Sequence, residues 1–304
     1  MKLIDPSFEI INQLTSGDPI INAKKQVELA ARTCYKSEDK ITDDSYESMY
    51  ERLLKSGHTS CLEHGTIYLY IEIGSPLDDK KYEEKQIIIS FFNKNKYSKV
   101  LQYRNNISGL VTIPTYYITT NLRVIEEQFP FGDGKLRWEM HQITVNRHQL
   151  ESYIVNPQDV SKFRKRISVK FICDRAIATQ ILRHRVFSFA MQSQRYCNYS
   201  KGKFGNEITF IKPEYEGKYP KFREILKQTE DAYFYLLSVG WKPEQARKVL
   251  PNATATEVFV TGFLDDWEWF FNLRARFKYG KPDDEMLRLS EPLHDKFREL
   301  WYIK

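Results

Sequence analysis

Cysteine is scarce in this chain, and the spacing of the few cysteines argues against two kinds of site. The 304 residues include only four cysteines, Cys34, Cys61, Cys173 and Cys197. None forms a Cys-x-x-Cys pair, and the first residues contain no apolar signal run. We therefore expect neither a metal site nor a disulfide framework. This pattern is typical of a reducing compartment, so we expect a cytoplasmic protein.

Long apolar runs, internal repeats and low-complexity tracts are also lacking. No window approaches the roughly 18 to 20 apolar residues that cross a bilayer, so no membrane contact is expected. With 41% hydrophobic and 28% charged residues, the composition is that of an ordinary globular protein. The net charge of +6 is modest. It suits a small anionic ligand and does not by itself indicate nucleic acid.

The most unusual stretch places arginine and histidine among apolar residues. Residues 174–185 are expected to form a helix with Asp174 as its cap and an apolar stripe on one side. On that helix Gln180, Arg183 and His184 stand at positions i, i+3 and i+4, so we expect them to share one face. One interpretation is a solvated basic helix end, where cations complement the helix dipole.

A phosphate site is the other interpretation of this stretch. Closely spaced arginines repel each other unless an anion lies between them, and a guanidinium group matches a phosphate well. One short loop later, Ser193, Gln194 and Arg195 add a hydroxyl, an amide and a further cation. These three residues favour the phosphate site over the solvated helix end.

Arg183-His184-Arg185, followed by seven residues and then Ser193, resembles the signature of the flavin-dependent thymidylate synthases. The resemblance covers both flanks of the chain and leaves out its middle. The other blocks in family order are Ser56-Gly57-His58 with Glu63-His64, Gln180, Arg195-Tyr196, Ala246-Arg247 with Val249-Leu250-Pro251, and Asn272-Leu273-Arg274.

The resemblance implies an α/β (α+β) fold, with a mixed sheet flanked by helices. It implies one catalytic domain over residues 1–304, interrupted by an insertion at residues 75–166 whose role the sequence does not indicate. It also implies a homotetramer whose active sites are shared between subunits.

The reaction implied is the methylation of dUMP to dTMP. Methylenetetrahydrofolate would give the carbon, and FAD reduced by NADPH would give the hydride. Arg274 is expected to stabilise negative charge on the uracil ring, and His58 is the second catalytic candidate. Arg195 and Arg247 are expected to hold the phosphate. The full set carried over for dUMP is Gln180, Arg183, Gln192, Ser193, Gln194, Arg195, Arg247 and Arg274.

For FAD the resemblance carries over Ser60, Arg183, His184 and Arg185, with Ser60 supplied by a neighbouring subunit. The chain also departs from the family pattern. Compact members have asparagine and arginine contacts in the segment aligned with Phe263, Asp265 and Trp269, and none is present here. Met191-Gln192 stands where a glutamate is common. An aromatic side chain such as Trp269 could stack on a ring instead.

Two alternatives stay open beside the enzyme. A family member could bind the nucleotide with weak or no turnover. A single-stranded nucleic-acid-binding module could use the basic and aromatic residues between Phe91 and Arg104. Aromatic residues that anchor the insertion on a core, with lysines facing water, are the favoured interpretation of that segment, so no nucleic-acid partner is expected.

The periodicity of the chain predicts its main elements. Strands are expected at residues 66–73, with one face in water, at 168–173 and at 257–261. Helices are expected at residues 23–32, from Asp44 to Gly57, between Pro220 and Gly240, and at Pro243. Asp265 is expected to cap a helix that ends at Arg274. A last helix at residues 284–301 is expected to be interrupted at Pro292.

Overall fold

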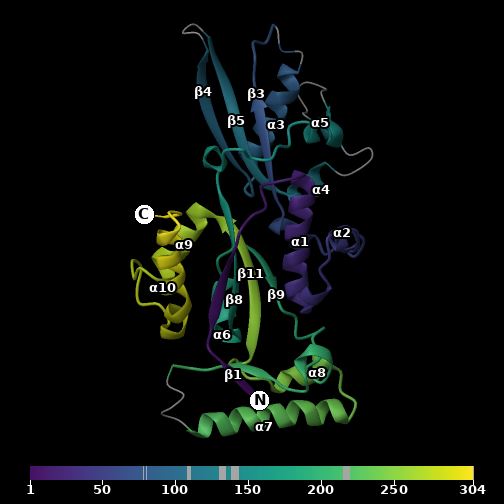
Figure 1. The fold of residues 1–304 in the computed structure, drawn as a ribbon, viewed down its shortest axis with the longest axis vertical. Helices are drawn as coiled ribbons and strands as arrows, with labels where there is room; N and C mark the ends of the chain where they lie inside the picture. The colour runs from purple at the N-terminus through teal and green to yellow at the C-terminus, as the bar shows by residue number, and fades with distance from the viewer. Residues whose placement is uncertain are drawn as a thin grey trace. The chain divides into compact units, whose positions relative to one another are not determined.

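The computed structural model describes residues 1–77, 79, 81–107, 111–129, 135–137, 144–214 and 220–303. Its chain folds into two compact units. The first unit comprises residues 1–11, 30–40 and 168–304, and the second comprises residues 12–29 and 41–167. Both contain helices and sheets (Figure 1), which confirms the expected mixed α/β class. No described helix is long and apolar enough to cross a membrane.

The elements of the first unit follow the chain in this order: β1 (Lys2–Ile4), β2 (Ser7–Ile11), β8 (Arg166–Asp174), α6 (Arg175–Ile181), β9 (Ser188–Met191), β10 (Thr209–Ile211), α7 (Pro220–Ser238), α8 (Pro243–Ala246), β11 (Ala255–Phe263), α9 (Leu264–Arg274) and α10 (Asp284–Glu299). Those that fall in the second unit are α2 (Ser45–Lys55), β3 (Thr66–Glu72), α3 (Tyr82–Lys94), β4 (Lys99–Ile107), β5 (Val111–Asn121), α4 (Leu122–Gln128), β6 (Lys135–Arg137), β7 (Thr144–Asn146) and α5 (Arg147–Glu151). Helix α1 (Pro19–Tyr35) contributes residues to both units, and the first two residues of β8 also fall in the second unit.

The first unit is built on a four-stranded sheet with the order β2-β8-β11-β9. The β2–β8 and β11–β9 pairs are antiparallel. The central strand β11 is apolar on both sides, and Val258, Phe259 and Val260 have no exposed surface. Helices α9 and α10 pack on each other and on strands of this sheet (Figure 1). Trp267 and Phe270 are fully buried between these elements, so burial of aromatic surface is the main stabilising term here.

Gly262 allows the chain after the motif arginines to approach β11 closely. A Cβ atom at position 262 would lie 2.2 Å from Cδ1 of Phe187. Such a contact is impossible without displacing the ring, which is itself buried. The ring of Phe187 also lies 4.6 Å from that of Trp267. The position of Phe187 therefore depends on the absence of a side chain at position 262.

The second unit contains a three-stranded antiparallel sheet with the order β3-β5-β4. The strand expected at residues 66–73 forms, but its predicted wet face is exposed only toward the end, where Tyr70 is half-buried and Glu72 is exposed. Residues 67, 69 and 71 are fully buried. On the opposite face Tyr68 is buried against Phe163, with ring centroids 5.1 Å apart. The edge of β3 is covered too, because Val155 N–H donates to the Tyr68 carbonyl oxygen.

Several local predictions are confirmed, and two are wrong. The helix from Asp44 to Gly57, the strands near 168–173 and 257–261, and the helices at Pro220 and Pro243 form with shifted ends. The cap of α9 is misplaced in the prediction. The carboxylate of Asp266, rather than of Asp265, accepts from Phe263 N–H at 3.1 Å. Helix α10 also continues through Pro292, because Leu289, Leu293 and Phe297 bury its apolar face on both sides of the proline.

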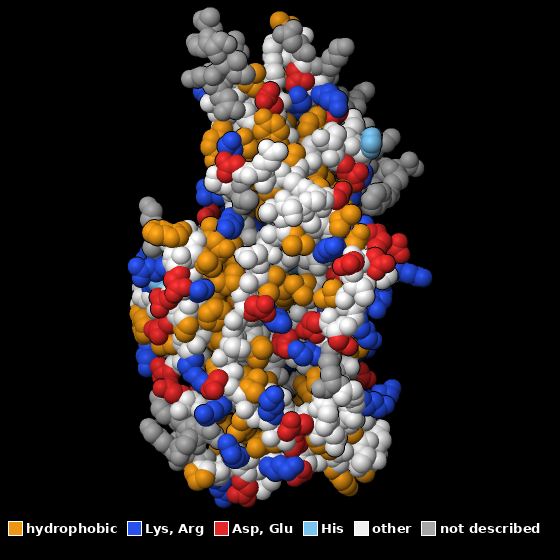
Figure 2. Space-filling view, in the orientation of Figure 1, with side chains coloured by type: hydrophobic (Ala, Val, Ile, Leu, Met, Phe, Trp, Pro, Cys, Tyr) orange, Lys and Arg blue, Asp and Glu red, His pale blue; other side chains and the backbone are white. Residues whose placement is uncertain are grey.

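Some aromatic residues of the predicted insertion are buried within that segment itself, while Tyr103 is exposed, so their anchoring on the rest of the core stays a prediction. Phe92 has no exposed surface. Phe91 makes edge contacts with Phe92 and with Phe129, at centroid distances of 4.9 and 5.5 Å. On the face of the molecule seen in Figure 2, lysine and arginine side chains are interspersed with aspartate and glutamate. Much of the expected mixed region at residues 126–149 lies outside the described residues.

Candidate functional site

The motif arginines follow α6 rather than forming part of it. Asp174 caps the helix as predicted, with its carboxylate accepting from Ile177 N–H at 2.7 Å. The helix ends at Ile181, so the prediction that it continues to Arg185 is wrong. A turn closed by His184 N–H to the Ile181 carbonyl, at 3.1 Å, replaces the last helical residues. Beyond this turn the chain packs Phe187 closely against Gly262 of β11.

The turn still brings the expected side chains to Arg274, which lies at the C-terminal end of α9. The Arg274 Nε–H donates to Nε2 of His184 at 3.2 Å. Its Nη1 donates to Oε1 of Gln180, also at 3.2 Å. The other end of the same amide, Nε2 of Gln180, donates to Oδ2 of Asp283 at 2.8 Å. We call Gln180, Arg183, His184, Arg274 and Asp283 the Arg274 cluster.

Burial and charge set the protonation of this cluster. His184 is buried, and burial, followed by the charge of Arg274, lowers its pKa from 6.5 to about 4. The imidazole is therefore neutral at pH 7 and accepts through Nε2, which leaves the proton on Nδ1. Burial first, and then Arg183, lowers the pKa of Arg274, whereas Asp283 raises it. Arg183 and Arg274 are thus two neighbouring cations beside a neutral His184. The cluster therefore suits an anion or the oxygen atoms of a polar ring.

A second group of predicted residues lies beyond β9. Ser193 N–H donates to the Cys34 carbonyl at 2.9 Å, and the Ser193 Oγ accepts from Arg195 N–H at 3.2 Å. The Arg195 Nε–H donates to Oε2 of Glu244 at 3.1 Å. Glu244 lies in α8, and Arg247 directly follows that helix. The ion pair with Glu244 therefore holds Arg195 near the segment that contains Arg247.

Two residues that the sequence analysis missed belong with this second group. Nη1 of Arg175 is buried and makes no hydrogen bond within the described chain, whereas the buried Oη of Tyr199 and Nε2 of Gln194 face each other in poor hydrogen-bond geometry. Burial, the leading cause, lowers the pKa of Arg175, and the charge of Arg247 adds to the effect. Buried donors of this kind require an acceptor. A signal was present in the sequence, because a cation in the first turn opposes the helix dipole.

We call Arg175, Gln194, Arg195, Tyr199 and Arg247 the Arg195 group. Helix α6 carries one member of each set, Arg175 and Gln180. The four residues of β9 lie in the chain between the motif turn and the loop of Gln194 and Arg195, and they span roughly 10 Å at about 3.3 Å per residue. The hydrogen bonds described above thus connect the predicted residues in two sets.

The remaining predicted residues have simpler surroundings. Gln192 is buried, with its N–H bonded to the Glu257 carbonyl at 2.8 Å. Arg185 is exposed after the turn. His58 and Ser60 belong to the second unit, where they are exposed in the segment that follows α2.

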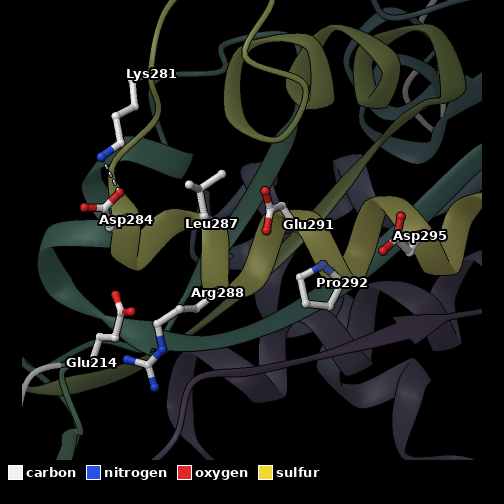
Figure 3. Close-up of a pocket in the computed structure, with 8 residues that line it drawn as sticks. All are labelled: Glu214, Lys281, Asp284, Leu287, Arg288, Glu291, Pro292 and Asp295. Atoms are coloured by element: carbon white, nitrogen blue, oxygen red, sulfur yellow. Dashed lines mark ion pairs between the residues drawn. The ribbon is translucent and has the colours of Figure 1, made fainter.

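A separate pocket of about 620 Å³ lies along α10. It is lined by Glu214, Lys281, Asp284, Leu287, Arg288, Glu291, Pro292 and Asp295. Figure 3 shows four carboxylates around the opening and an ion pair from Lys281 to Asp284, which measures 2.9 Å. The acidic side chains outnumber the basic ones, so this pocket does not suit a nucleotide monophosphate.

Comparison with known proteins identifies curated relatives that match about a third of the chain. The flavin-dependent thymidylate synthase of Pyrococcus furiosus is 35% identical over 106 residues, which cover 34% of this chain and 43% of that protein. The protein of the same name from Geobacter sulfurreducens is 34% identical over 119 residues, covering 38% and 51%. The chain thus spans about half, or less, of the length of these curated relatives.

One solved structure that aligns with this chain is that of PolB, a UMP/dUMP methylase from Streptomyces cacaoi, bound with 5-Br UMP. The alignment covers 99% of this chain and 92% of the PolB chain. The identity is 14% and the TM-score is 0.42.

A family match covers a larger part of the chain than the pairwise alignments. The model of the family described as thymidylate synthase complementing protein (Thy1) matches residues 19–77 and 141–300. The unmatched residues 78–140 lie within the segment predicted as an insertion, whose bounds stay a prediction. The matched residues include the Arg-His-Arg turn and Arg274. The chain therefore belongs to the thymidylate synthase complementing protein family.

Proposed function

We propose that this protein methylates dUMP to dTMP, with methylenetetrahydrofolate as the carbon donor. The observation that carries the proposal is the placement of Arg274, which Gln180 and His184 hold from two sides. A guanidinium fixed beside a uracil ring stabilises the negative charge that develops when the ring is polarised toward an enolate. Because the guanidinium is already oriented, little reorganisation is needed when that charge forms.

The Arg195 group suits the phosphate of the same substrate. A phosphate monoester is a dianion with several acceptor oxygens, and Arg175 offers a buried donor that makes no hydrogen bond among the described residues, with Gln194 and Tyr199 nearby. Arg195 and Arg247 add positive charge. Ser193 has no basic partner for a nucleophilic role in its contacts above, so it serves to bind and orient. Nucleotide binding would compete with Glu244 for Arg195.

A shared active site reconciles the two sets of residues. The Arg274 cluster would contact the base and the Arg195 group the phosphate, and the family resemblance implies active sites that are shared between subunits. We infer that the protein assembles as a homotetramer in which one subunit supplies the first set and a neighbour the second. Ser60 would likewise reach the cofactor from a neighbouring subunit.

Of the three motif residues proposed to bind FAD, Arg183 and Arg185 are accessible to a ligand, whereas His184 between them is buried. Arg183 and Arg185 are exposed on either side of His184, which suits the pyrophosphate of a dinucleotide. His184 itself is buried and its Nε2 is bonded to Arg274. Trp269 is 47% exposed and lies beside Tyr279, with centroids 5.1 Å apart, so an aromatic surface is open to ring stacking. When bound, the flavin would supply the hydride after reduction by NADPH.

The first experiment combines a spectrum with a turnover assay. The purified protein should be yellow, or become yellow with added FAD, and should oxidise NADPH when dUMP and methylenetetrahydrofolate are present. Arg274→Ala should lower kcat on the order of a hundredfold. Arg276→Ala is the matched control, since Arg276 instead bonds Nε2 of His294 at 2.9 Å. A protein that binds nucleotide without turnover would contradict the proposed enzyme, and an unchanged kcat in Arg274→Ala would exclude this role for Arg274.

A further inference from the structure

Asp283 is a residue to which the sequence assigned no role. It stands immediately before α10, where its Oδ1 accepts from Glu285 N–H at 3.0 Å and caps the helix. Its second oxygen, Oδ2, accepts from Nε2 of Gln180 at 2.8 Å. One carboxylate therefore fixes both the start of α10 and one end of the Gln180 amide.

The side-chain amide of Gln180 makes one hydrogen bond through its oxygen and one through its nitrogen, and neither partner can switch between donor and acceptor. An ionised carboxylate only accepts hydrogen bonds, and a guanidinium only donates them. If the Gln180 amide turned over, its oxygen would face the Asp283 carboxylate and its N–H groups would face Arg274. Both hydrogen bonds would be lost and replaced by repulsive contacts. The structure thus allows one orientation of this amide.

A fixed amide can distinguish two pyrimidines that a rotating amide cannot. Uracil presents a donor at N3 beside an acceptor at O4, whereas cytosine presents an acceptor at N3 beside an amino donor at N4. The donor and acceptor therefore occur in opposite order on the two rings. An amide that is free to turn over can match either order, but an amide held at both ends matches only one.

We infer that Asp283 is a positioning residue that fixes the Gln180 amide and thereby the preference of the site for uracil over cytosine. The inference rests on the proposed function, because it takes Gln180 to contact the base of dUMP. Asp283 itself need not touch the substrate. Its second effect is electrostatic, since its charge raises the pKa of Arg274.

The test compares two neighbouring aspartates. Asp283→Ser and Asp283→Asn both retain a good helix cap, while the serine is too short to reach Gln180 and the asparagine is no longer an obligate acceptor. Asp284→Ser is the control, because Asp284 pairs with Lys281 and faces the α10 pocket (Figure 3). Dissociation constants for dUMP and dCMP would be measured by calorimetry on FAD-saturated protein, with thermal unfolding as a check on the fold.

We expect Asp283→Ser to reduce the preference for dUMP over dCMP on the order of tenfold, the effect of one charge-assisted hydrogen bond. Asp283→Asn should reduce it less, and Asp284→Ser should leave it unchanged. An unchanged preference in both Asp283 variants would overturn the inference, and so would an equal reduction in Asp284→Ser. Should the serine variant not fold, the asparagine variant decides.

The same data separate this inference from the proposed reaction. A protein that prefers dUMP to dCMP but forms no dTMP would contradict the reaction while leaving the Asp283 comparison valid. A protein that binds both nucleotides equally would contradict the uracil preference itself.

Discussion

The neutral state of His184 predicts how stability depends on pH. In the unfolded chain an imidazole titrates near 6.5, whereas in the folded protein burial and Arg274 lower the His184 pKa to about 4. Between these two values the unfolded state binds a proton that the folded state excludes. The stabilisation is therefore fully present above pH 6.5 and is lost as the pH falls toward 4.

The size of the effect follows from the two pKa values. One pKa unit corresponds to about 1.4 kcal/mol. A pH of 5 lies about 1.5 units below the pKa of His184 in the unfolded chain. Protonation of the unfolded chain should therefore lower the free energy of unfolding by roughly 2 kcal/mol relative to pH 7.5. This is a sizeable part of the 5 to 15 kcal/mol typical of a folded domain.

The assay is urea unfolding at pH 7.5 and pH 5, followed by tryptophan fluorescence, to which the buried Trp267 contributes. His184→Gln provides the comparison, because a glutamine can accept from Arg274 but does not titrate. All other ionisable groups are shared, so their contributions cancel. The wild type should lose roughly 2 kcal/mol more than His184→Gln over this pH range. An equal loss in both proteins would refute a buried, neutral His184.

Two further predictions concern the phosphate and the packing of the motif turn. Arg175→Ala and Arg247→Ala should each weaken binding of dUMP more than binding of deoxyuridine, measured by calorimetry; equal losses for both ligands would remove these residues from the phosphate site. Gly262→Ala should destabilise the protein by about 1 to 3 kcal/mol through its clash with Phe187, whereas Gly74→Ala, which would make only an ordinary contact of 3.4 Å, should have a small effect. A thermal-unfolding comparison in which the two alanine variants behave alike would contradict the close approach at Gly262.

Local chemistry explains which parts of the fold could be predicted. The cap at Asp174 depends on the residues next to it, and it was found. The chain beyond α6 packs Phe187 against Gly262, which is distant in sequence, so the periodicity of residues 174–185 could not reveal that contact. Likewise, the burial of β3 results from Phe163 and from residues 153–155, and an alternating strand pattern does not contain that information.

The candidate site divides in the same way. The resemblance placed Gln180, Arg183 and Arg274 at the nucleotide base and His184 at FAD. The structure brings Gln180 and His184 into hydrogen bonds with Arg274, and what these residues bind stays a prediction. Arg175 and Tyr199 were missed because their burial is visible only after the chain has folded; for Arg175 the sequence offered one weaker signal, a cation in the first turn of a helix. The functional roles assigned to His58, Ser60 and Arg185 stay predictions.

The hydrogen bond from Ser193 to the Cys34 carbonyl has a practical consequence for protein engineering. It links the loop that begins at Ser193 to the segment at the end of α1. A truncated variant starting after residue 40 would retain every arginine proposed to bind nucleotide, but it would lack the backbone oxygen that anchors this loop. Deletions at the N-terminal side should therefore impair ligand affinity even when all the recognisable motifs are intact.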